Sequence, residues 1–235
     1  MTARRMLIIA ALLALGTAWG AQSGAMTARP VVVWGLAKPV RVVTTAGSST
    51  PSGAIAPANV CAYPNNSKTP LSCFKAEISG RDFFRRPMAR IVAFAGSKHG
   101  VLFEASYNAG GSGSSNFWAL LVFGSRGSWK DLLPDVTTSE QGDELYWHSA
   151  ELSPYGLFTV ADYKWGKGET HFGPHKYEIK TYKFCPSRGA YVLADQYLTS
   201  AKFPGLDETD AISVIKPSFA EIRARLLRHP HPGCN

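Results

Sequence analysis

The sequence predicts a mostly β fold, an antiparallel sandwich, barrel or propeller-like meander, followed by one C-terminal amphipathic helix. Two observations predict it. From Cys73 onward, short runs of β-branched and aromatic residues recur between Gly, Pro, Asn and Ser residues, which is the pattern of successive strands and turns. Near the C-terminus, apolar residues recur instead at spacings of three and four, as on one face of a helix.

The chain begins with a segment typical of export signals. Two arginines precede the apolar run 6–15, and the small-x-small patterns at 18–20 and 23–25 offer two cleavage sites. The run is well short of the roughly 20 residues that cross a bilayer. We therefore predict that residues 1–25 are a signal peptide, that the protein is periplasmic or secreted, and that it makes no stable membrane insertion.

Residues 26–235 are predicted to form a single mostly β domain with an irregular N-terminal section, 26–72, which is rich in Pro, Gly, Ser and Thr. Two short β-like runs, 31–34 and 40–44, interrupt that section. The formal net charge of +8 is spread along the chain, and without a clustered stripe it does not predict nucleic-acid binding. The nearest cluster is favoured as a solvated loop beside a strand, with an anion-binding patch as the alternative: Arg81, Arg85, Arg86 and Arg90.

The four cysteines predict disulfides, because exported thiols are normally oxidised. Four cysteines allow three connectivities. The short spacing of Cys61 and Cys73 favours a local bridge, which leaves Cys185 to pair with Cys234. Zinc is the competing interpretation, but the metal-binding C-x2-C spacing is absent from the sequence.

Two kinds of strand are predicted, which implies a layered structure. The run Phe117–Phe123 is apolar on both alternating faces and should be covered on both sides. In contrast, Tyr177 and Ile179 alternate with charged residues, which describes one buried and one wet face. The predicted strands are 73–78, 90–95, 101–106, 116–123, 155–162, 175–184, 189–199 and 211–215.

The tail predicts a helix that starts with a capping box. Ser218 is followed three residues later by Glu221, and Phe219, Ile222 and Leu226 lie at helical spacings. Pro230 should end the helix. We expect this helix to pack against the β body, held there by the disulfide at its C-terminal side.

Most sequence motifs of catalysis are missing. The glycine-rich stretch 110–115 lacks the Gly-Lys-Ser/Thr ending of a phosphate-binding loop and is interpreted as a hairpin tip. There is no G-x-S-x-G nucleophile elbow. The sequence predicts no cofactor, no catalytic residue and no bound metal.

The segment 165–182 is the exception, because Glu169, His171 and His175 fall within seven residues beside a turn at Gly173 and Pro174. Two histidines and a carboxylate suit zinc, non-haem iron or acid–base work. However, H-E-x-x-H on a helix would have fixed such a site, and Gly and Pro argue against a helix here.

A structural role is the favoured interpretation of these three residues. If a strand begins at His175, this side chain shares a face with Tyr177 and points to the core. Glu169 and His171 then lie in the exposed connection and would pair with a lysine there: Lys164, Lys167 or Lys176. Nearby aromatic residues make ligand binding the better functional alternative, since Trp and Tyr stack on sugars and anchor interfaces: Tyr163, Trp165 and Phe172.

The same segment resembles a group of uncharacterised exported bacterial proteins that carry W-x3-E-x-H-x3-H-x-Y, followed five residues later by tyrosine. Here the pattern is Trp165, Glu169, His171, His175, Tyr177 and Tyr182. The resemblance spans about Arg90–Phe203. It implies an exported mostly β protein and no particular activity.

The sequence therefore favours an exported, disulfide-stapled binding or interaction protein over an enzyme. Its partner would be a cell-envelope glycan or a protein, contacted by loop residues. The predicted binding residues are Trp165, Glu169, His171, Phe172 and His175. The alternative is a metal-dependent hydrolase that uses Glu169, His171 and His175.

Overall fold

The computed structural model describes residues 29–45, 58–78, 83, 87–110, 113–170, 173–204, 213–228 and 234. The predicted signal peptide lies outside these ranges, as do Arg81, Arg85 and Arg86 of the predicted basic cluster. The fourth member of that cluster, Arg90, forms an ion pair with Glu144 at 3.1 Å. Arg90 is therefore already engaged within the protein.

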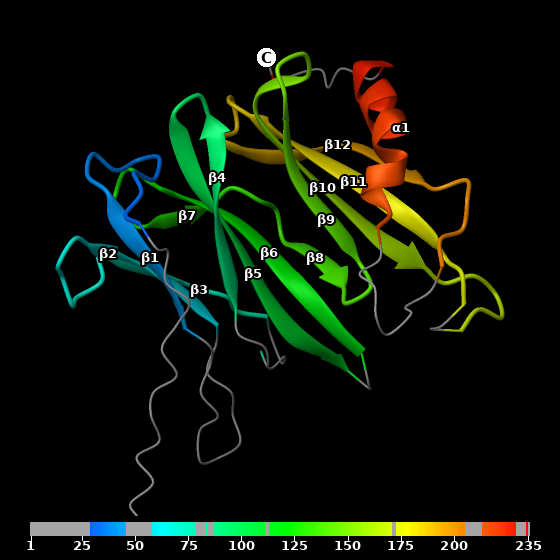
Figure 1. The fold of residues 1–235 in the computed structure, drawn as a ribbon, viewed down its shortest axis with the longest axis horizontal. Coiled ribbons are helices and arrows are strands. Elements are labelled where there is room, and N and C mark those ends of the chain that lie inside the picture. Colours follow the sequence, from blue (N-terminus) through cyan, green and yellow to red (C-terminus); the bar gives the residue numbers. More distant parts are fainter. Residues whose placement is uncertain are drawn as a thin grey trace, which may run out of the picture.

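The strands form two antiparallel sheets, which curl into a half-barrel (Figure 1). β1 (Val40–Thr45), β2 (Asn59–Pro64) and β3 (Ser72–Lys75) make up the small sheet. The large sheet has the order β12-β11-β10-β4-β5-β6-β7, with β8 paired to β6 and β9 paired to β10. Its strands are β4 (Met88–Ala95), β5 (Lys98–Gly110), β6 (Gly113–Phe123), β7 (Trp129–Asp131), β8 (Val136–Ser139), β9 (Asp143–Ser149), β10 (Ser153–Lys164), β11 (Lys176–Cys185) and β12 (Ala190–Leu198).

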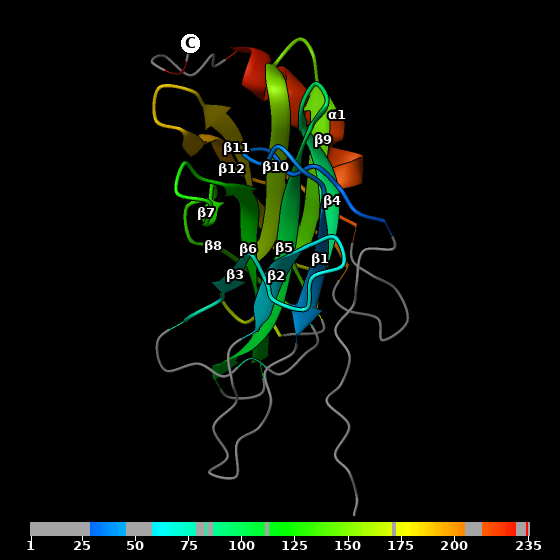
Figure 2. The ribbon, with the colours of Figure 1, turned by 90° about the vertical axis from the view of Figure 1, so that its left-hand side faces the viewer.

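One helix, α1 (Ile215–Arg228), follows the strands. The small sheet packs on the part of the large sheet formed by β4 to β6, and α1 packs on the part formed by β9 to β11, at the left and right of Figure 1. Figure 2 looks onto the side that carries β1 and β2. This arrangement confirms the mostly β, antiparallel class with one C-terminal helix. Among the described residues, no helix has the length and hydropathy that a membrane span requires.

The core is layered, as the two kinds of strand predicted. In β6, the odd-numbered residues from Phe117 to Phe123 pack towards the small sheet, whereas Trp118, Leu120 and Val122 pack inside the curl. A third apolar layer lies between α1 and the outer face of β9 to β11, where Tyr177 and Ile179 are buried. Both faces of the large sheet are therefore covered.

Only a few backbone contacts between the described strands hold the curl together at one end. β10 meets β4 at a single pair, Tyr155 with Ala95. On the other side, the Tyr191 amide of β12 donates to the Leu132 carbonyl, which follows β7, at 2.7 Å. Aromatic side chains fill this end, and Phe94, fully buried, lies at their centre. Side-chain packing therefore holds the curl where backbone pairing is sparse.

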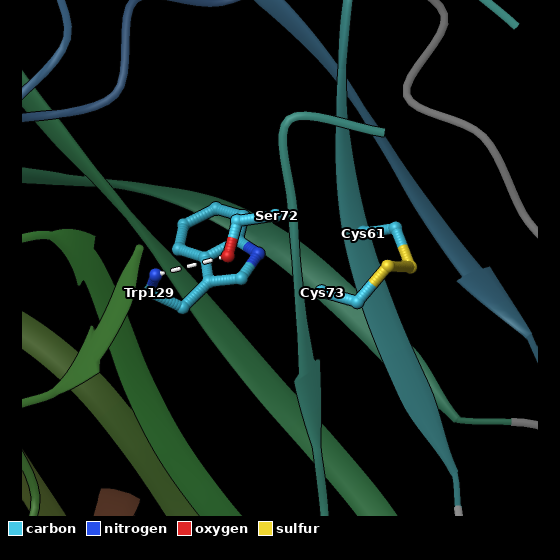
Figure 3. Close-up of a disulfide and its surroundings, with 4 residues drawn as sticks. All are labelled: Cys61, Ser72, Cys73 and Trp129. Atoms are coloured by element: carbon cyan, nitrogen blue, oxygen red, sulfur yellow. Dashed lines mark hydrogen bonds between the residues drawn. A yellow bond between two sulfur atoms is a disulfide. The ribbon is translucent and has the colours of Figure 1, made fainter. Parts of the chain in front are cut away.

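Both predicted disulfides are present. Cys61 and Cys73 face each other across the β2–β3 pair (Figure 3). Beside this bridge, the Trp129 amide of β7 donates to the Ser72 hydroxyl at 3.3 Å, which joins the small sheet to the large one (Figure 3). Cys185, at the end of β11, binds Cys234, six residues beyond the last residue of α1. Every cysteine of the chain is thus oxidised.

The predicted start of the helix was wrong, because its cap comes from a distant strand. The helix begins at Ile215, and the Ser218 amide already donates to the Val214 carbonyl. The amides of Val214 and Ile215 both donate to Asp143 Oδ2 of β9, at 2.8 and 2.7 Å. An acceptor from elsewhere in the fold thus satisfies amides that a helix start leaves free.

We expect Asp143→Ala to lower the free energy of unfolding by about 1–2 kcal/mol, the range of a lost helix cap. Asp143→Asn retains an acceptor oxygen and should lose much less. Ser218→Ala should cost under about half of the Asp143→Ala loss, because Ser218 lies inside the first turn. Urea unfolding of the three variants measures this order, and an equal loss in Asp143→Ala and Ser218→Ala would contradict the cap assignment.

The sequence missed four strands and misassigned one. β2 lies in the section predicted to be irregular, and β7, β8 and β9 were not predicted. The run 31–34 makes isolated bridges at Val31 and Val33. The predicted strand 211–215 is contradicted at its end, since Ile215 is the first residue of α1; residues 211 and 212 lie outside the described ranges.

Candidate functional site

Three of the predicted binding residues, Trp165, Glu169 and His175, lie in the connection between β10 and β11. These strands pair up to Lys164 and Lys176, so they bring Tyr163 opposite Tyr177. The chain turns sharply after Trp165: the Glu169 amide donates to the Gly166 carbonyl at 3.2 Å, and Gly168 has a φ of 78°. That backbone region favours glycine. His171 and Phe172 of the predicted set lie outside the described residues.

His175 is fully buried at the start of the returning strand. Its amide donates to the Phe203 carbonyl at 2.9 Å, and its carbonyl accepts from the Phe203 amide at 2.8 Å. The backbone of Phe203, which follows β12, therefore holds the backbone of His175 in place. This burial agrees with the prediction that His175 points to the core.

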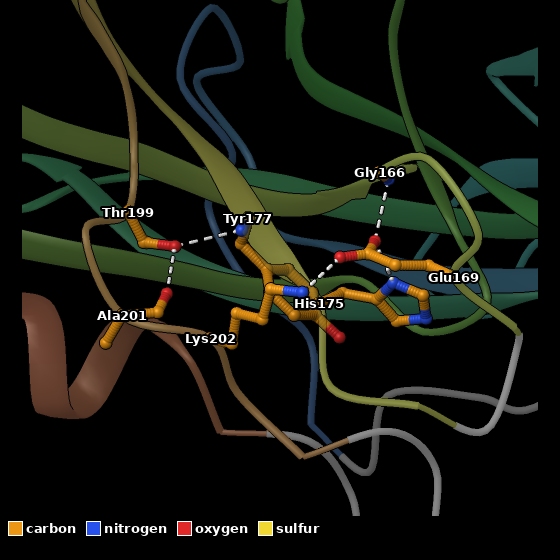
Figure 4. Close-up of polar contacts among 7 residues, drawn as sticks. All are labelled: Gly166, Glu169, His175, Tyr177, Thr199, Ala201 and Lys202. Carbon is orange, nitrogen blue, oxygen red and sulfur yellow. Dashed lines mark hydrogen bonds and ion pairs between the residues drawn. The ribbon is translucent and has the colours of Figure 1, made fainter.

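Glu169 reaches back over the turn to lock it (Figure 4). Its carboxylate accepts hydrogen bonds from Lys202 Nζ at 2.5 Å, from His175 Nδ1 at 3.0 Å and from the Gly166 amide at 2.7 Å. These three donors, Lys202 first, lower the pKa of Glu169 to about 2. Glu169 is thus ionised at neutral pH and holds three separate parts of the chain together.

The ionised Glu169 carboxylate determines which nitrogen of the buried His175 ring carries a hydrogen. Because a carboxylate only accepts, His175 Nδ1 must carry the hydrogen. The opposite nitrogen, Nε2, is buried and makes no hydrogen bond to the described residues. His175 has no exposed surface, and its ring packs against those of Tyr163 and Trp165.

Trp165 packs against the buried His175 imidazole and faces solvent. Its ring packs edge-on against Tyr163, with centroids 5.2 Å apart, and against His175, also at 5.2 Å. Tyr163 in turn packs on His175 at 5.1 Å. Trp165 nevertheless keeps 51% of its surface exposed, the most of any described tryptophan. We call Tyr163, Trp165, Glu169, His175 and Lys202 the Trp165 platform.

The ion pair predicted for Glu169 was wrong, and the one predicted for His171 lies outside the described residues. Glu169 pairs with Lys202, which follows β12, rather than with a lysine of its own segment. Lys164 pairs instead with Glu178 at 2.9 Å. Lys202 was missed because it lies 33 residues from Glu169, and the sequence around it carries no motif that would link the two.

The geometry gives the metal interpretation little support. Two of its three residues, Glu169 and His175, bind each other, and the other Glu169 oxygen binds Lys202. Across the described ranges, no group of three His, Cys, Asp or Glu side chains is arranged to hold a metal ion. A hydrogen bond from Nδ1 to a carboxylate fixes the tautomer of a histidine whether or not a metal is bound, and here the buried imidazole packs against the exposed Trp165 ring.

Comparisons with protein-family models, with curated proteins and with solved structures find no significant match to this chain. The functional conclusion therefore depends on the residues and their geometry.

Proposed function

We propose that this is an exported binding protein that contacts a glycan of the cell envelope through the Trp165 platform. The observation that carries the proposal is the half-exposed Trp165 ring on the buried His175 imidazole, which binds Glu169, itself bound by Lys202. An indole face presents a large apolar surface with a polar edge, which suits the apolar face of a sugar ring. Lys202 and Glu169 of the platform offer hydrogen-bond partners for the hydroxyl groups of a sugar.

Rigidity supports a binding role. A ligand that orders a mobile loop must offset the lost entropy of that loop, whereas a preorganised surface avoids this cost. Glu169 fixes the turn through three hydrogen bonds, and the Phe203 backbone fixes His175. Trp165 therefore stands in place before a ligand arrives.

Export is part of the proposal and has separate support. The disulfides Cys61–Cys73 and Cys185–Cys234 are of a kind that persists in oxidising compartments. Residues 1–25 have the composition of a signal peptide. A periplasmic or secreted protein would meet envelope glycans directly.

We expect Trp165→Ala to weaken glycan binding at least about tenfold, since a central aromatic anchor typically contributes more than 1 kcal/mol. The probes are a β-1,4-linked N-acetylglucosamine trisaccharide, maltotriose and trigalacturonate, each titrated calorimetrically into residues 26–235. Leu198→Ala is the matched control, because Leu198 is also 51% exposed but lies on β12; it should bind as the unsubstituted protein does.

Two results would contradict the proposal. One is that none of the three sugars binds at about 10 mM, which means a binding free energy weaker than about 3 kcal/mol. That result would favour a protein ligand over a glycan. The other is that Trp165→Ala and Leu198→Ala bind a sugar equally well, which would place the binding surface elsewhere.

A further inference from the structure

The exposed groups of the Trp165 platform indicate what kind of sugar it would accept. The single polar atom of an indole is its ring nitrogen, whose N–H can only donate. In Trp165 this N–H donates to the Tyr163 hydroxyl, and the two rings meet edge to face with their centroids 5.2 Å apart. The exposed surface of Trp165 therefore offers an apolar ring, because its N–H is already used within the protein.

The Tyr163 hydroxyl keeps a hydrogen of its own to donate. A tyrosine hydroxyl that accepts from an indole still carries that hydrogen. Within the described ranges, the Tyr163 hydroxyl donates to no protein acceptor. Tyr163 is only partly buried, and it adjoins Trp165. A ligand that packs on the Trp165 ring would thus meet this donor at the border of the ring.

Lys202 provides a second donor. Its ammonium uses one hydrogen on Glu169 at 2.5 Å (Figure 4), and two more remain for other acceptors. The Lys202 side chain is 50% exposed, whereas that of Glu169 is only 13% exposed and already accepts from three donors. The exposed polar groups of the platform are therefore mainly donors that lie beside an apolar ring.

We infer that the Trp165 platform recognises N-acetylated sugars, with the acetamido carbonyl accepting from the Tyr163 hydroxyl while the apolar face of the sugar ring packs on Trp165. This inference rests on the proposed function and names the class of glycan. An amide oxygen has two acceptor sites and no hydrogen, so it suits a surface rich in donors. The acetamido methyl group adds apolar contact area, and Lys202 donates to another oxygen of the glycan.

Two other kinds of sugar fit the platform less well. A sugar with a hydroxyl in place of the acetamido group lacks the methyl contact and brings one more hydrogen that needs an acceptor. A uronic acid would bring its carboxylate to Lys202, where the ionised Glu169 already lies and would repel it. Lys167, exposed in the same turn, is the cation that would favour such an acid, so the test includes an acidic sugar.

The test compares two trisaccharides that share the β-1,4 linkage and differ in the acetamido group. The N-acetylglucosamine trisaccharide and cellotriose, which has hydroxyls at those positions, are titrated calorimetrically into residues 26–235, with trigalacturonate as the acidic probe. We expect the N-acetylglucosamine trisaccharide to bind at least about fivefold more tightly than cellotriose, the contribution of one hydrogen bond. Trigalacturonate should bind more weakly than the N-acetylated sugar.

Tyr163→Phe keeps the ring and removes the hydroxyl, so it tests whether Tyr163 determines the specificity. We expect the preference for the N-acetylglucosamine trisaccharide over cellotriose to fall below about twofold in this variant. Cellotriose binding that persists would show that Trp165 still presents its ring. Tyr197→Phe is the matched control, because Tyr197 lies on β12 and packs in the layer beneath α1; it should keep the full preference.

Three outcomes would overturn the inference. Equal affinities for the N-acetylglucosamine trisaccharide and cellotriose, both lost in Trp165→Ala, would leave glycan binding by the platform intact and remove the N-acetyl preference. Tightest binding of trigalacturonate would assign the platform to acidic sugars. A preference that survives unchanged in Tyr163→Phe would show that Tyr163 does not recognise the acetamido group. If no sugar binds, the proposed function fails together with this inference.

Discussion

Replacing Cys185 and Cys234 together by serine is expected to lower the free energy of unfolding by about 4 kcal/mol. The bridge closes a loop across 49 positions and ties the chain after α1 to the end of β11. Without it, the unfolded chain gains the entropy of that loop. Guanidinium unfolding of the oxidised protein and of the double variant gives the difference.

The second bridge provides an internal comparison. Cys61 and Cys73 are separated by 12 positions, so replacing both by serine should cost less, about 3 kcal/mol in the same chain-entropy description. A larger loss for the shorter loop would mean that local contacts of the small sheet, rather than loop entropy, determine what each bridge contributes.

Phe94→Ala is expected to cost about 3–5 kcal/mol, the usual range for truncating a buried phenylalanine. Phe94 has no exposed surface and packs on four rings, those of Trp34, Tyr155, Phe184 and Tyr191, at centroid distances of 4.7 to 6.3 Å. These rings belong to both sides of the curl. The loss should therefore exceed that of an ordinary half-buried aromatic residue.

The control for this substitution is Phe94→Leu, which keeps most of the apolar volume and should cost less than about half as much. Thermal unfolding followed by near-ultraviolet circular dichroism reports both the stability and the aromatic packing. A loss below about 1 kcal/mol in Phe94→Ala would contradict the view that this cluster holds the closed end of the curl.

The sequence predicted those features that depend on neighbouring residues. Alternation along Phe117–Phe123 revealed a strand covered on both sides, because the period of a strand is visible in a short run. The short spacing of Cys61 and Cys73 gave the first disulfide, and elimination gave the second. The charged alternation beside Tyr177 and Ile179 correctly distinguished their buried face.

Features that depend on distant residues could not be predicted in this way. The cap of α1 comes from Asp143, 71 positions before Val214, so the local Ser218 pattern was misleading. The partner of Glu169 is Lys202, on a different connection. β9 begins with two carboxylates that serve opposite faces, and this hides the apolar alternation of a strand.

The Trp165 platform was predicted in part: all its residues except Lys202 could be found from the sequence, but their contacts could not. The sequence pointed to Trp165, Glu169 and His175 through residue type and a turn at Gly173 and Pro174. It could not show that Glu169 binds His175, or that Trp165 remains half exposed against a buried ring. In the structure, Glu169 and His175 support the half-exposed ring of Trp165.

The most direct test of that surface is a proton–nitrogen correlation spectrum of residues 26–235, titrated with the N-acetylglucosamine trisaccharide, maltotriose and trigalacturonate in turn. Each tryptophan indole gives its own signal, and Trp165→Phe identifies that of Trp165. We predict that a sugar shifts the Trp165 indole signal most, while the buried Trp118 and Trp147 change little. No shift with any sugar up to about 10 mM, or shifts centred on another tryptophan, would contradict the assignment of the Trp165 platform as the glycan-binding surface.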